Sequence, residues 1–232
     1  MINDEGIYAR IPNDFFYNDG KLLQEIGGRD SFILYCLLVS RKSMSHEIYI
    51  SFKEINNTLK LHRNTTKARV NITNNLRLLK QNNLIDYDVD IDNVGSNDCM
   101  VIKWMNKFPT KDDFGWVKFY ADDFKIHNKI GDVPYCVMWI LRMYIHFEKG
   151  VSFISITDIT AILKCDRMKV QNSIDLFGAI ELFEVIKGEY YFNVEYGRRI
   201  KMNNSYKYTG NIDVLLKTND NYIKAILNKN IK

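Results

Sequence analysis

Hydrophobic positions along the chain alternate between helical spacing and short runs of strand-like alternation. A Ser stands before the second helical segment, with an acid three residues later, which predicts a helix start at Ser51 with a capping box formed by Glu54. The predicted elements of the first half, in chain order, are an apolar helix over Asp30–Lys42, a strand over Glu47–Ile50, a helix from Ser51, a second helix over Asn64–Gln81, and a hairpin of Leu84–Ile91 with Met100–Met105.

The same series of elements recurs about a hundred residues later. The segment ISFKEINNTLKLHR, which begins at Ile50, aligns with ISITDITAILKCDR, which begins at Ile154, and the matches fall at one register. We infer an internal duplication. The predicted elements of the second copy are a helix over Val133–Glu148, a strand over Val151–Ile154, a helix opened by Ser155 with Asp158, a helix over Asp166–Phe177, and a hairpin of Leu182–Ile186 with Tyr190–Val194.

Helix, strand, helix, turn, helix and hairpin is the element order of a winged helix, in which the second helix of the pair enters the DNA major groove. The predicted fold class is therefore α+β, with two tandem winged-helix domains. The first domain is predicted over residues 1–108 and the second over residues 109–196, followed by a basic C-terminal tail over residues 197–232.

The second helix of the first copy is the candidate recognition helix. Helical spacing predicts a core stripe of apolar residues, and no acidic residue occurs between Leu59 and Arg77. Lys and Arg neutralise phosphates, while Arg, Asn, Thr and Val side chains suit base edges. The alternative is an ordinary solvated face. The predicted DNA-binding residues on the outer face are Arg63, Thr66, Lys67, Val70, Thr73, Asn74 and Arg77.

The corresponding helix of the second copy favours DNA less. Its predicted outer face carries Met168, Lys169, Asn172 and Asp175, with Leu176 at the edge. An acid there repels phosphate, and the apolar residues suit protein. A protein contact or dimer surface is therefore as good an interpretation as DNA contact.

The predicted first wing is acidic, with Asp86, Asp88, Asp90 and Asp92 at alternating positions. A calcium loop of the EF-hand type needs Gly at its sixth position and Glu at its twelfth, and here Ile91 and Asn97 stand there. We therefore expect no metal, and a solvated acidic wing that points away from DNA or binds a basic partner.

The formal net charge of +4 is unevenly distributed. Residues 197–232 carry +6, so the remainder of the chain carries −2. We expect three of the tail's cations, Arg198, Arg199 and Lys201, to follow a phosphate backbone or reach into a minor groove. The alternative is a flexible, solubilising terminus.

The chain lacks the phosphate-binding glycine motifs, and its four His residues have no metal-ligand spacing. We expect no catalysis, no cofactor and no metal ion. Its four Cys residues are dispersed, no apolar stretch is long enough to span a bilayer, and no secretory signal is visible. These features predict a cytoplasmic protein without a membrane partner.

The first hundred residues resemble the RepA-type replication initiators of low-GC bacterial plasmids and phages, which carry tandem winged helices. The resemblance lies in YARIPNDFF, in DSFILYCLLVSRKS and in IYISFKEINNTLKLHRNTTKARVNITNNLRLLKQNNLI. It implies sequence-specific binding of double-stranded DNA at repeated origin sequences (iterons) and recruitment of host replication proteins. The acidic first wing departs from the usual basic wing.

Three other expectations remain open. The chain could instead serve as a transcriptional or segregation regulator of a mobile element. A second alternative is a protein-interaction adaptor of the replisome that uses winged helices as scaffolds. A homodimer formed through the second domain or the tail is a further candidate partner.

Overall fold

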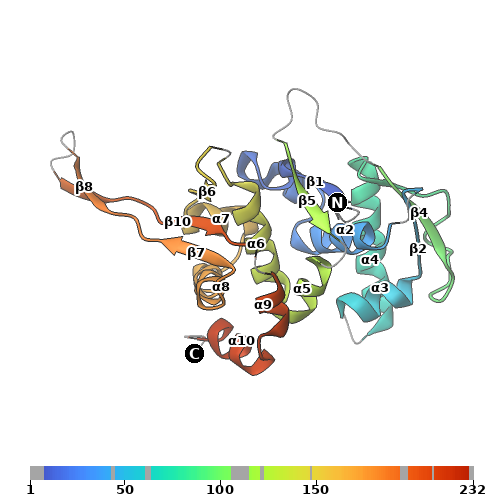
Figure 1. Ribbon diagram of the computed structural model, residues 1–232. Helices are drawn as coiled ribbons and strands as arrows, with labels where there is room; N and C mark the ends of the chain where they lie inside the picture. The colour runs from blue at the N-terminus through green and yellow to red at the C-terminus, as the bar shows by residue number, and fades with distance from the viewer. Residues whose placement is uncertain are drawn as a thin grey trace, which may run out of the picture. The chain divides into compact units, whose positions relative to one another are not determined.

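The computed structural model describes residues 8–42, 45–60, 64–105, 115–120, 123–146, 148–193, 198–210 and 212–229. The chain divides into two compact units, Met1–Asn128 and Lys129–Lys232 (Figure 1). Helices and small antiparallel sheets make up both units, which confirms the predicted α+β class. No helix among the described residues is both long and apolar enough to cross a membrane.

Unit 1 begins with a strand and two short 3-10 turns and continues with helices α1 to α4. Strand β4 lies between β2 and β3 in a three-stranded antiparallel sheet, and β1 pairs with β5 in a two-stranded one. The elements are β1 (Tyr8–Pro12), η1 (Asn13–Phe15), η2 (Asn18–Gly20), α1 (Lys21–Glu25), α2 (Arg29–Ser40), β2 (Glu47–Ile50), α3 (Phe52–Leu59), α4 (Thr65–Gln81), β3 (Ile85–Asp86), β4 (Met100–Trp104), β5 (Trp116–Tyr120) and α5 (Asp123–Ile130), which runs past the unit boundary.

The core of unit 1 forms around α2, whose residues 31–39 are all buried. Phe15 and Phe16 pack against Phe32 at ring-centroid distances of 5.0 and 4.8 Å. The Trp104 Nε1–H donates a 2.8 Å hydrogen bond to the Tyr35 hydroxyl, which joins β4 to α2 inside this core. Buried aromatic residues therefore hold β4 and the N-terminal segment against α2.

The sequence supplies a side-chain cap at the start of each of the helices α3 and α4. The Ser51 side chain accepts a hydrogen bond from the Glu54 N–H, and the Asn64 side chain accepts one from the Lys67 N–H. Lys60 ends α3 in the left-handed conformation, with φ of 52°. Lys164 ends the matching helix of unit 2 in the same way, with φ of 45°. Both copies therefore turn at the aligned position.

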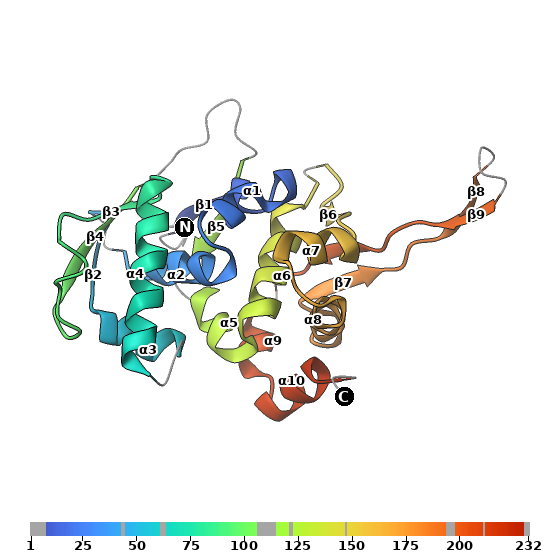
Figure 2. The ribbon, with the colours of Figure 1, turned by 180° about the vertical axis from the view of Figure 1, so that it is seen from behind.

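Unit 2 repeats the helix, strand, helix, helix order and adds a long hairpin and two C-terminal helices (Figures 1 and 2). Strand β10 lies between β6 and β7. The elements are α6 (Asp132–Met143), β6 (Val151–Ser152), α7 (Ile156–Leu163), α8 (Arg167–Ala179), β7 (Phe183–Ile186), β8 (Tyr190–Asn193), β9 (Arg198–Lys201), β10 (Ser205–Tyr208), α9 (Ile212–Lys217) and α10 (Asp220–Leu227).

The predicted boundary between residues 108 and 109 lies too early. Strand β5 pairs with β1 over its whole length, from Tyr8 opposite Tyr120 to Pro12 opposite Trp116, so residues 116–120 belong to unit 1. The apolar helix of the second copy also ends earlier than predicted, at Met143, although β2 and α4 lie almost where the pattern places them.

The predicted basic tail over residues 197–232 is wrong as a separate segment. Strand β10 is the central strand of the unit 2 sheet, and the aromatic ring of Tyr206, which is 2% exposed, is part of the core. The predicted hairpin of Leu182–Ile186 with Tyr190–Val194 is wrong for the same reason. Strand β7 pairs with β10, and β8 pairs with β9.

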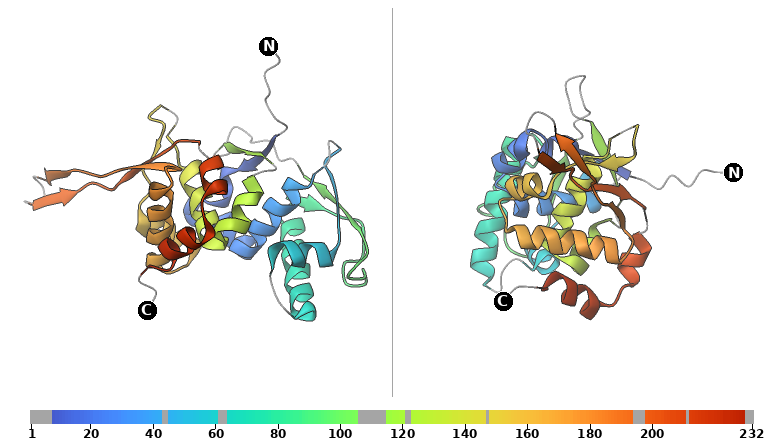
Figure 3. Two further views of the ribbon diagram at one scale, coloured as in Figure 1. Left: turned by 60° about the horizontal axis from the view of Figure 1, so that its bottom comes forward. Right: turned by 90° about the vertical axis from the view of Figure 1, so that its left-hand side faces the viewer.

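These four strands form one long hairpin, here named the ribbon (residues 183–208). Phe183 faces Tyr208 at its base, and Asn193 faces Arg198 near its tip, with the same residue offset in both halves. The ribbon extends well beyond the helices of its own unit (Figures 1 and 3). At the break between its two halves, Gly188 lies so close to the carbonyl of Met202 that a side chain there would collide with it.

Helix α10 packs against α8 (Figure 2). The Asn172 side chain, 2% exposed, donates hydrogen bonds of 2.9 and 2.8 Å to the carbonyls of Leu227 and Lys229. The Leu227 carbonyl is one of those that the end of α10 leaves without an intrahelical partner, and Lys229 follows just beyond the helix. Asn172, predicted on the outer face of this helix, is therefore buried under the chain's own C-terminal segment, and Leu176, predicted at the edge of that face, is buried as well.

Candidate nucleic-acid interface

The outward side of α4 is polar and carries no acid. Lys67, Val70, Asn71 and Asn74 are exposed and follow the i, i+3, i+4, i+7 spacing of a single helix face. Thr66 is exposed beside this face, in the first turn. We call these five residues the α4 face. The sequence prediction named all of them except Asn71, although its spacing from Lys67 was a usable signal.

Two predicted residues of this helix do not join the α4 face. Thr73 is only 6% exposed, so it lies on the buried side of α4. Arg77 forms an ion pair with Asp92. A third predicted residue, Arg63, lies outside the described residues. The remaining predictions, Thr66, Lys67, Val70 and Asn74, are exposed as expected.

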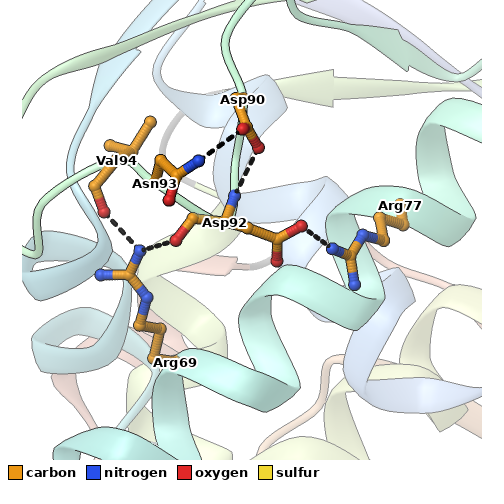
Figure 4. Close-up of polar contacts among 6 residues, drawn as sticks. All are labelled: Arg69, Arg77, Asp90, Asp92, Asn93 and Val94. Atoms are coloured by element: carbon orange, nitrogen blue, oxygen red, sulfur yellow. Dashed lines mark hydrogen bonds and ion pairs between the residues drawn. The ribbon is translucent and has the colours of Figure 1, made fainter.

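The acidic segment between β3 and β4, here named the acidic loop (residues 87–99), folds back on α4 instead of pointing away from it. Arg69 donates to the carbonyls of Asp92 and Val94, and Arg77 binds the Asp92 carboxylate (Figure 4). Asp90 supports this arrangement because its carboxylate accepts hydrogen bonds from the Asp92 N–H and the Asn93 side chain. The loop thus engages both arginines on one flank of α4.

Lys80, one turn beyond Arg77, is also paired with an acid. Its Nζ lies 2.8 Å from the Asp86 carboxylate and donates a 2.6 Å hydrogen bond to the Tyr87 carbonyl. The hydrogen bond between the two side chains raises the pKa of Lys80 and lowers the pKa of Asp86. Lys67 has no such acid, and among the described residues it forms no ion pair. The cation available to an external anion on α4 is therefore Lys67.

Unit 2 treats the corresponding face differently. Counted from the N-caps Asn64 and Asp166, the positions of the α4 face past the first turn match Lys169, Asn172, Ser173 and Leu176 of α8. The last three are buried, and α10 packs on this helix. The positions that unit 1 exposes as polar surface are thus mostly buried in unit 2, and at Asn172 the C-terminal segment covers them.

The ribbon places the predicted cations of the C-terminal segment on one strand. Arg198, Arg199 and Lys201 all lie in β9, opposite Asn193, Phe192 and Tyr190 of β8. Arg199 and Lys201 are exposed, and the Lys201 Nζ lies 5.9 Å from the centroid of the exposed Tyr190 ring. Cations on one strand beside aromatic residues on the partner strand can contact both phosphates and base surfaces.

No group of three or more His, Cys, Asp or Glu side chains that could hold a metal ion occurs in the described part of the chain. Comparisons with protein-family models, curated proteins and solved structures found no match to this chain.

Proposed function

We propose that the chain binds double-stranded DNA in a sequence-specific manner through two winged-helix domains, as a replication initiator of a plasmid or phage. The observation that carries the proposal is the α4 face, which combines an unpaired lysine with two asparagines, a threonine and a valine, and contains no acid. Lys suits a phosphate, Asn pairs with adenine, and Val or Thr contacts the thymine methyl.

The topology of unit 1 supports this use of α4. The sheet order β2-β4-β3 beside α2, α3 and α4 follows the winged-helix order of elements, and in helix-turn-helix proteins the first turns of the second helix contact base edges. The exposed residues of the α4 face lie in that half of the helix, between Thr66 and Asn74. The flank of α4 that the acidic loop contacts, with Arg69 and Arg77, lies beside the α4 face.

The ribbon supplies the second contact in this proposal. Its β9 cations, Arg199 and Lys201, follow phosphates or enter the minor groove, in the role that the sequence prediction gave them. Helix α8 takes no part, because α10 packs on it.

One observation favours a second candidate, a protein-interaction adaptor. Unit 2 already uses the equivalent helix to bind α10, through the buried Asn172. The α4 face carries the exposed polar residue Asn74 at the place of the buried Leu176, so its partner must accept a polar side chain there. DNA meets that requirement better than an amphipathic helix does.

The test is binding of the full chain to DNA fragments from its native locus, followed by fluorescence anisotropy at several salt concentrations. Lys67→Glu should abolish binding, and Lys21→Glu is the matched control, because it makes the same charge change on α1, where Lys21 pairs with Glu25. Affinity should fall steeply with salt. Salt-independent binding, or equal loss in both variants, would refute the proposal.

A further inference from the structure

The two edges of the ribbon's outer half differ in chemistry. Strand β9 carries Arg198, Arg199 and Lys201, whereas β8 is the uncharged sequence Tyr190, Tyr191, Phe192, Asn193. Natural sheets protect an edge strand with charges or with a covering element, because its open backbone groups otherwise pair with another chain. Charge protects the edge of β9.

The inner half of the ribbon is protected as well. Strand β10 is covered by β6, and β7 carries Glu184, which pairs with Lys207 at 3.5 Å. Strand β8 has neither a charge nor, among the described strands, a neighbour other than β9. Tyr190 is 67% exposed on it. Such a strand is aromatic, favourable for a sheet, and open on one side.

The hydrogen bonds show which backbone groups reach that open side. The Met202 N–H donates to the Glu189 carbonyl at 2.8 Å, which makes these two residues a hydrogen-bonded pair. In an antiparallel ladder such pairs alternate with pairs that exchange no hydrogen bonds. Tyr190 opposite Lys201 and Phe192 opposite Arg199 are of the second kind, so the N–H and C=O groups of Tyr190 and Phe192 point to the open edge of β8.

The outer half of the ribbon would gain stability from a further strand. A two-stranded hairpin by itself is marginally stable in water, and three or more strands are needed for independent stability. The outer half of the ribbon contains two strands, β8 and β9. A further strand on β8 would complete a sheet without moving any part of the chain.

We propose that β8 pairs antiparallel with β8 of a second copy of this chain, which gives a four-stranded sheet in the order β9, β8, β8 of the second copy, β9 of the second copy. Charge selects this arrangement. Pairing β9 with itself would bring Arg198, Arg199 and Lys201 against the same cations, whereas pairing β8 with itself brings no charged residues together. The interface uses the same strand of both copies around a two-fold axis.

The proposed sheet places the cations of both copies on its two outer edges. The dimer is independent of DNA, so its test and that of the DNA-binding proposal can fail separately. The interface consists of short strands, and we expect a weak dimer whose population depends on protein concentration.

Sedimentation velocity of the full chain without DNA, over a range of concentrations, tests this proposal. Phe192→Pro removes an N–H that points to the open edge and leaves the β8–β9 hydrogen bonds in place. It should weaken the dimer at least about tenfold, since both copies lose the group. Arg199→Pro, which makes the same change on the outer edge of β9, is the matched control and should leave the dimer unchanged.

A second variant covers the case in which proline disturbs the ribbon. Tyr190→Glu places a carboxylate opposite Lys201 within its own hairpin, which keeps the hairpin favourable, but adds like charges to the β8 edge of both copies. It should also weaken the dimer. A wild-type chain that stays monomeric at every concentration, or a dimer that survives both β8 substitutions, would overturn the proposal.

Discussion

Asp92 of the acidic loop forms an ion pair with Arg77 of α4, one of the residues predicted from the sequence to contact DNA. The same loop binds Arg69 through the Asp92 and Val94 carbonyls (Figure 4). If α4 binds DNA, the loop removes two cations from competition for phosphate. On the DNA-binding proposal, the acidic loop therefore weakens the contact.

Asp92→Asn should tighten DNA binding severalfold, because Arg77 then gains freedom to contact phosphate and one repulsive charge disappears. The plot of log affinity against log salt should steepen by about one unit. Asp88→Asn is the control. This substitution removes the same charge from the acidic loop, but Asp88 pairs with Lys103 of β4, so Arg77 is not freed. An equal gain in both variants would mean that net charge alone is responsible.

Asn74→Ala and Lys67→Ala should weaken DNA binding in different ways. Asn74 is expected to read a base, so its loss should cost about 1–3 kcal/mol on the preferred sequence and relax the preference at one position. Lys67 is expected to contact phosphate, so its loss should weaken all sequences alike and reduce the salt slope by about one unit. Competition binding with a randomised site library distinguishes the two patterns.

Asn172→Ala should loosen α10 from α8. The substitution leaves the Leu227 and Lys229 carbonyls without their donor, at a cost of about 1–3 kcal/mol. Amide hydrogen exchange should accelerate in α10 more than in α2. Gln171→Ala, whose side chain pairs with Asp175 at the surface of α8, serves as the control and should leave exchange in α10 as it is.

High pH should destabilise unit 1 through Tyr35. Burial raises the pKa of this hydroxyl well above its ordinary value of 10.0, although the hydrogen bond from Trp104 opposes part of the shift. The folded state therefore holds the proton that the unfolded state releases, so this contribution to stability is complete below pH 10 and is lost as the pH rises further. In unit 2, burial also raises the pKa of the Tyr206 hydroxyl.

Urea unfolding at pH 8 to 11 measures this effect. Stability should fall above pH 10, and the absorbance of tyrosinate should rise together with the loss of helical signal. Tyr35→Phe should be less stable at pH 8, because the Trp104 N–H loses its acceptor, but should show a shallower decline above pH 10. A parallel decline would assign the alkaline transition to other tyrosines.

Removal of residues 197–232 should unfold unit 2 instead of trimming a tail. The deletion removes β10 from the middle of its sheet and takes away Tyr206, a buried core residue, together with α10. Circular dichroism and limited proteolysis of the shortened chain should show loss of structure in unit 2. A fully folded shortened chain with the same thermal transition would contradict the assignment of β10 to the core.

Periodicity and capping predicted the helices well, because both are local properties. The strand at Glu47–Ile50 and the helix that ends at Gln81 lie where the pattern places them. The Ser51 side chain caps its helix by accepting from the Glu54 N–H, whereas the reciprocal capping box, which was predicted there, is found at Ser155 with Asp158. The predicted strand pairing of unit 2 was wrong. Two neighbouring segments with alternating polarity have the same local pattern whether they pair with each other or with strands farther along the chain. Local sequence does not distinguish these choices.

The candidate site was predicted in part. An angle on a helical wheel placed Lys67 and Asn74 outward, but it could not reveal that residues 15 or more positions away in the chain return to cover one flank. Arg77 meets Asp92 through such a return, and Thr73 is buried on that side. The cover on α8 is a tertiary contact as well, made by a helix some fifty residues later in the chain.

Because both halves of the ribbon share one residue offset, the length of the ribbon is independent of the packing of unit 2. Because Phe183 faces Tyr208 and Asn193 faces Arg198 in one count, two residues added to each strand beyond Gly188 would move the tip outward by about 7 Å and leave the sheet at the base unchanged. The reach of the hairpin can thus change through paired insertions without any repacking of the core.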